Sequence, residues 1–88
     1  MNNTEQDPKK EITRSPDFKY IPCDSINLAI SDNGIKLLLG VEELDGSIHE
    51  MIGVHMTHRT AMFLKSALVR GLDHYQEKTG ITLEEPEI

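Results

Sequence analysis

Two dipeptides, Asn33-Gly34 and Asp45-Gly46, constrain the fold of this chain more than any other feature. Each lies between segments in which apolar and polar residues alternate. Both favour a two-residue β-turn, because its central residues need a positive φ that asparagine, aspartate and glycine adopt at low cost. The spacing therefore predicts a three-stranded antiparallel meander with residues 35–41 in the central strand.

The two turns, taken independently, predict one register. The first turn predicts the pairs Ile30 with Leu37, Leu28 with Leu39, and Ile26 with Val41. The second turn predicts the pairs Leu39 with Ile52, Leu37 with Val54, and Ile35 with Met56. All these side chains fall on one side of the sheet, and a slip of one residue would expose the whole set to water.

A long helix is predicted after the third strand. Thr57 is placed to cap its start, and Gly80 followed by Ile81 is typical of its end. Apolar residues recur at helical spacing in between, at Ala61, Leu64, Leu68, Leu72 and Tyr75. A helix of about twenty residues is ~30 Å long, enough to cover the apolar face from end to end. The expected fold is α+β, in the order β-β-β-α, with the helix packed on one sheet face.

The domain organisation follows from polarity. We expect a flexible N-terminal arm over residues 1–19, the folded domain over 20–82 and an acidic tail over 83–88. A domain of about sixty residues buries only ~60% of its unfolded surface and is marginal alone. Cys23 is the only cysteine, so an internal disulfide is excluded. A second subunit is the remaining common source of stability.

The helical segment resembles the end of a small bacterial family catalogued only as a domain of unknown function. Its members carry S-P-x-x-A-K-x-L-x-x-A-L, an apolar residue four positions on, and Y-E-x-x-F-G. Thr57 takes the serine position, and the matching residues are Ala61, Leu64, Ala67, Leu68, Leu72, Tyr75 and Gly80. The departures are His58, Met62, Gln76 and Thr79. The resemblance covers residues 20–81 and implies three strands before a helix, but no activity.

The charge of the chain argues against nucleic acid as a partner. The net charge is −6, and phosphate binding depends on lysine and arginine releasing counterions. No apolar segment is long enough for a signal peptide or a membrane span, so we expect a cytoplasmic protein without a membrane partner. The acidity leaves one alternative function open, a small inhibitor that mimics nucleic-acid charge, as phage anti-defence proteins do. Against it, Arg59, Lys65 and Arg70 on the predicted helix interrupt a negative surface.

The histidines do not predict a metal site within one subunit. His49 and His55 are ~20 Å apart along an extended strand, too far to share one ion. The register places His49 opposite Glu42 and His55 opposite Lys36. A thiol nucleophile at Cys23 would need an activating histidine, and His49 is the only candidate near that end of the sheet, so we expect a non-reactive cysteine. We therefore expect no enzyme, no cofactor and no metal, while histidines from two subunits remain an alternative.

The outer face of the sheet, away from the helix, carries a small apolar patch with a polar rim. The expected interface residues are Ala29, Leu38, Gly40, Met51 and Gly53, with Gly71 as a site of close helix approach. Such a patch is typical of an interaction surface. The sequence thus predicts a non-enzymatic protein-interaction module that self-associates as a homodimer through the sheet face or edge and also binds an unidentified protein partner.

Overall fold

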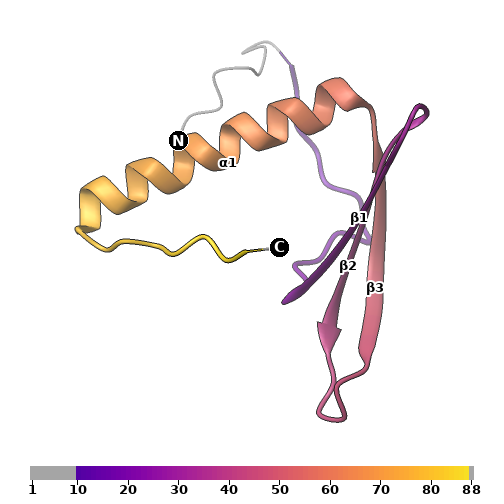
Figure 1. The fold of residues 1–88 in the computed structure, drawn as a ribbon. Coiled ribbons are helices and arrows are strands. Elements are labelled where there is room, and N and C mark those ends of the chain that lie inside the picture. The colour runs from indigo at the N-terminus through magenta and orange to yellow at the C-terminus, as the bar shows by residue number, and fades with distance from the viewer. Residues whose placement is uncertain (1–9, 88) are drawn as a thin grey trace.

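The computed structural model describes residues 10–87, which form a three-stranded sheet followed by one long helix (Figure 1). The strands are β1 (Ser25–Ser31), β2 (Gly34–Glu42) and β3 (Ile48–Met56), and the helix is α1 (His58–Thr79). The sheet is antiparallel with the order β1-β2-β3. The predicted α+β class and the β-β-β-α order are confirmed.

The predicted register between β2 and β3 is confirmed over half of the ladder. Ile35 pairs with Met56, Leu37 with Val54 and Leu39 with Ile52, and Lys36 lies opposite His55 as expected. Beyond Leu39 a β-bulge shifts the pairing by one residue. His49 therefore lies opposite Val41, and its predicted partnership with Glu42 is wrong.

The bulge is explained by Gly40, over which the backbone of β3 passes closely. A Cβ added at Gly40 would collide with the His49 carbonyl oxygen and lie 2.8 Å from the Glu50 Cα. Only glycine leaves room for that approach, and one extra residue of β3 is then accommodated without a partner.

We expect Gly40→Ala to destabilise the fold by about 3 kcal/mol, because the new methyl group meets backbone that cannot move aside. Gly53→Ala is the matched control, since a Cβ there meets only the flexible Leu38 Cδ2, at 3.3 Å. It should cost less than about 1 kcal/mol. Urea unfolding at one protein concentration measures both, and equal losses would contradict the close approach at Gly40.

The predicted register between β1 and β2 is wrong by two residues. Ile30 pairs with Ile35, Leu28 with Leu37 and Ile26 with Leu39, so the loop consists of Asp32 and Asn33. Gly34 alone takes the positive φ, 127°, and it does so as the first residue of β2. A shift of two preserves the face of every side chain. The apolar set therefore stays together, and we call it the inner face: Ile26, Leu28, Ile30, Ile35, Leu37, Leu39, Val41, Ile52, Val54 and Met56.

The second turn is held by Asp45. Its carboxylate accepts hydrogen bonds from the Ser47 hydroxyl at 2.7 Å and from the Ser47 backbone N–H at 2.9 Å. These bonds, the hydroxyl first, lower the pKa of Asp45. Because the folded pKa is depressed, the stabilisation is present above the unfolded pKa and is lost as pH falls through the folded pKa.

We expect Ser47→Ala to raise the pKa of Asp45 towards its ordinary value, because the variant removes the larger of the two hydrogen bonds. An NMR titration of the Asp45 carboxyl carbon measures the shift. Ser31→Ala, a serine truncation in the first turn, is the control, because it leaves both hydrogen bonds to the Asp45 carboxylate in place. An unchanged Asp45 pKa would show that the hydroxyl contributes nothing.

Both predicted helix caps are confirmed. The Thr57 hydroxyl accepts a hydrogen bond from the Thr60 backbone N–H at 3.1 Å. At the other end Gly80 has a φ of 74° and donates its N–H to the Gln76 carbonyl oxygen at 2.9 Å. The helix therefore begins and ends where the sequence places it.

The expected coverage of the inner face from end to end is not observed. Helix α1 leaves the end of β3 and extends away from the strands (Figure 1), and none of its residues is buried. Thr57 alone connects β3 to α1, whereas a helix folded back on its own sheet usually follows a loop of 2–6 residues. Ile35, with 9% of its surface exposed, is the only buried large apolar residue in the described part of the chain.

The segments that flank the domain contain no helix or strand within the described residues. In the N-terminal segment, Arg14 stacks 4.7 Å from the centre of the Phe18 ring, which packs edge-on against Tyr20. After α1, the Leu83 N–H donates to the Gln76 side-chain oxygen at 2.6 Å. Residues 1–9 and 88, parts of the predicted arm and tail, lie outside the described residues, and the mobility of both segments stays a prediction.

Candidate functional site

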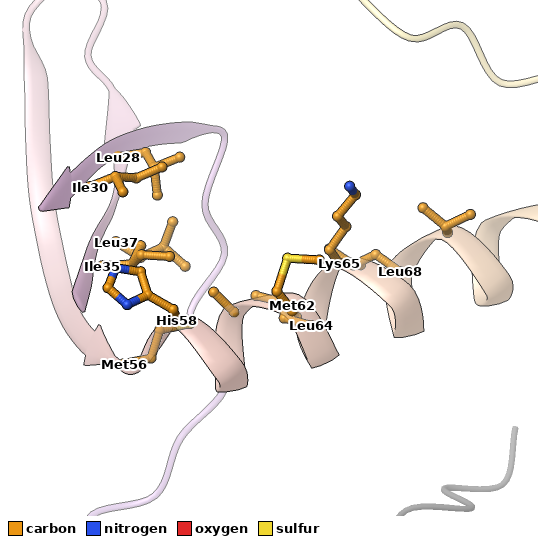
Figure 2. A pocket seen from close by; sticks show the side chains of 12 residues that line it. Leu28, Ile30, Ile35, Leu37, Met56, His58, Met62, Leu64, Lys65 and Leu68 are labelled. Atoms are coloured by element: carbon orange, nitrogen blue, oxygen red, sulfur yellow. The ribbon is translucent and has the colours of Figure 1, made fainter. Parts of the chain in front are cut away.

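A cavity of about 760 Å³ lies between the inner face and the first three turns of α1 (Figure 2). We call it the inner wedge. Its lining residues are Leu28, Ile30, Ile35, Leu37, Met56, His58, Ala61, Met62, Leu64, Lys65, Leu68 and Val69. The sheet and the first three turns of α1 thus form the two walls of the cavity, and the rest of the helix extends beyond it.

The walls of the inner wedge offer little chemistry. Among its lining residues only His58 and Lys65 carry polar side-chain groups. His58 is already occupied, because its Nε2 lies 2.8 Å from the Ser31 carbonyl oxygen and donates to it. That bond ties the start of α1 to the end of β1. A site that binds or transforms a small polar molecule needs several converging polar groups, which this cavity lacks.

The exposure of the inner wedge is unusual for apolar side chains. Leu28 and Leu68 are slightly more than half exposed, and Leu64 is more than one third exposed. Leu72 and Tyr75, which continue the helical stripe, are about half exposed. Exposed apolar patches of this extent mark interaction surfaces, because leaving them in water costs roughly 25 cal/mol per Å².

The total surface area supports the same conclusion. The chain exposes 8249 Å², whereas a compact monomer of 9.9 kDa exposes about 5200 Å². Part of the excess comes from the extended segment 10–24. The exposed inner wedge contributes to the same excess, and one side of a standard protein interface, ~800 Å², is well within it.

The outer face brings together some of the predicted interface residues. Leu38 lies between Asn27 on β1 and Gly53 on β3, and it covers Gly53. Ala29 instead shares its row with Lys36, because of the two-residue shift in register. Ala29 therefore does not lie beside Leu38 and Gly53. Leu38 is half-buried within the subunit, which leaves a smaller apolar patch than the inner wedge.

The remaining predicted interface residues have different surroundings. Gly40 is buried under the backbone of β3, so its glycine is required by the bulge rather than by docking. Met51 is 47% exposed beside that bulge. Gly71 has open space where a Cβ would be, so the subunit itself does not need a glycine there.

Groups that could bind metal are dispersed over residues 10–87. No three His, Cys, Asp or Glu side chains gather within that range as a metal site would require. Cys23 is an exposed free thiol. No helix in the described range is long and apolar enough to cross a membrane.

Comparison of the chain with models of protein families, with curated proteins and with solved structures finds no match. The resemblance of residues 20–81 to a bacterial domain of unknown function therefore stays a prediction.

Proposed function

We propose that the chain is a non-enzymatic protein-interaction module that self-associates, and that a second copy of it fills the inner wedge. The observation that carries this proposal is the pair of apolar walls, sheet and helix, left apart and exposed by a single subunit. Two apolar surfaces that a single subunit leaves exposed are typical of subunits that complete their folding on association.

A second copy suits the inner wedge better than an unrelated ligand does. Each copy has both an exposed apolar helix stripe and an exposed apolar sheet face. A two-fold axis can therefore bury both surfaces in both subunits at once. The nearly apolar lining fits another apolar surface and offers no partner for a charged ligand apart from Lys65. The same scarcity of polar groups supports a non-enzymatic role.

The cytoplasm is the location we propose. The exposed free thiol of Cys23 fits a reducing compartment, where unpaired cysteines persist. We also propose that the assembled dimer binds a further protein through the outer face around Leu38.

Sedimentation equilibrium over a series of concentrations tests self-association. The expected result is a species of twice the 9.9 kDa chain mass that dissociates on dilution. A mass of one chain at every concentration would overturn the proposal. A mass that grows without limit would show open-ended aggregation in place of a closed dimer.

A further inference from the structure

We infer that the two copies join edge to edge through β1, so that the dimer contains one continuous six-stranded sheet. This inference rests on the proposed self-association and specifies its geometry. The partner is a second copy of β1 running antiparallel to the first, with the two-fold axis near Leu28, the midpoint of the strand. Both inner faces then lie on the same side of the joined sheet.

The first observation is a gradient of exposure across the inner face. The apolar residues of β1 are the most exposed, with Ile26 at 67%, Leu28 at 54% and Ile30 at 66%. On the other edge, Ile52 and Val54 of β3 are 37% and 38% exposed. Both strands lie at edges of the sheet, so the higher exposure of the β1 side chains indicates that no neighbouring residues cover them on that side. A neighbouring strand there would bring its own inner-face residues against these side chains.

The second observation is the chemistry of the two edges. Proteins protect free edges with charged residues, proline or a bulge, because unpaired N–H and C=O groups invite another strand. β3 has such protection, since it contains Glu50, two histidines and the bulge opposite Gly40. β1, with the sequence SINLAIS, contains no charged residue, no proline and no bulge.

The third observation is that the outer edge of β1 is free within the described part of the chain. No backbone hydrogen bond from another segment reaches residues 26–30 outside the ladder with β2. The nearest additional bonds fall at the ends of the strand, from Asp24 to Gly40 and from His58 to Ser31. An antiparallel partner strand would pair the remaining groups of β1 in both subunits equally, as a two-fold axis requires.

The decisive experiment is an isotope-filtered NOE measurement on a dimer mixed from labelled and unlabelled wild-type chains. Antiparallel pairing around Leu28 predicts intermolecular NOEs between backbone protons of β1 and β1, with Asn27 opposite Ala29 of the partner subunit. A dimer whose intermolecular NOEs involve β3 or the outer face instead would overturn the edge-to-edge arrangement and leave self-association intact. A monomeric sample would overturn both proposals.

A pair of matched variants gives an independent measurement. Ala29 and His55 are the two cross-strand neighbours of Lys36, one on each edge strand. Ala29→Lys and His55→Lys therefore place the same ammonium group beside the same lysine. We expect Ala29→Lys to raise the dissociation constant of the dimer at least tenfold and His55→Lys to leave it within about twofold, because β1 is the edge strand that pairs with the partner and β3 is not. Equal effects of the two variants would contradict the β1 interface.

Discussion

Replacing Leu68 with glutamate is expected to convert the dimer into a monomer. Leu68 lies on the helical wall of the inner wedge and is 53% exposed in one subunit. The variant removes apolar contact and places a carboxylate in a nearly apolar interface, where the Lys65 ammonium one turn away is the one lysine of the lining. We expect the dissociation constant to rise a hundredfold or more, which corresponds to about 3 kcal/mol.

Leu38→Glu is the matched control for this prediction. It introduces the same charge on the opposite side of the sheet, where Leu38 covers Gly53. Sedimentation velocity at equal concentrations should find Leu68→Glu monomeric and Leu38→Glu dimeric. The reverse result would move the interface to the outer face that the sequence predicted. Circular dichroism of both variants separates a lost interface from a lost fold.

The second large effect is expected at Ile35. This residue is 9% exposed, it pairs with Ile30 on one side and Met56 on the other, and it lines the inner wedge. Truncating a buried isoleucine to alanine removes transfer free energy and leaves a cavity, at a cost of about 2–5 kcal/mol. In a domain with so little buried apolar surface, that loss would leave most of the chain unfolded at room temperature.

Ile48→Ala is the matched control for Ile35→Ala, because the same truncation is made at a residue that is 49% exposed. Urea unfolding at one fixed concentration compares the two, since the stability of a dimer depends on the concentration of its subunits. We expect a loss for Ile48→Ala of less than half that for Ile35→Ala. Equal losses would mean that the centre of the fold lies elsewhere.

The sequence predicted the elements of this fold well because each has a local cause. Thr57 caps the helix through its side chain and Gly80 through its φ, and the two turn dipeptides between alternating segments identify the three strands. The face of each strand residue also survived the error at the first turn, because the shift was even. What failed there was the choice of loop, since Gly34 rather than the Asn33-Gly34 pair carries the positive φ.

The bulge could have been predicted from the sequence. Met51 and Ile52 are adjacent apolar residues that break the alternation of β3, and Gly40 on the neighbouring strand removes the side chain that would block the bulge. Such a break in period is typical of one extra residue in a strand. The extra residue in β3 moves His49 away from Glu42. The pairing of these two residues, inferred from an unbroken register, is therefore absent.

The inner wedge could be predicted only in part from the sequence. The amphipathic stripe shows that the helix must cover something, but periodicity does not reveal whether the covered surface belongs to the same subunit. The single residue between Met56 and the helix was the available signal, because it leaves too little chain for the helix to turn back. The cluster of Arg14, Phe18 and Tyr20 gave no periodic signal and was missed.

Accessibility of methyl groups to a soluble paramagnetic agent tests the central claim most directly. Leu44, which is fully exposed in the second turn, provides the internal reference. At concentrations where the protein is dimeric, we expect the methyl groups of Leu28, Leu64 and Leu68 to be strongly protected relative to Leu44, and the protection to fall on dilution. Methyl groups in the inner wedge that relax as fast as those of Leu44 at every concentration would contradict the burial of this surface by a second copy.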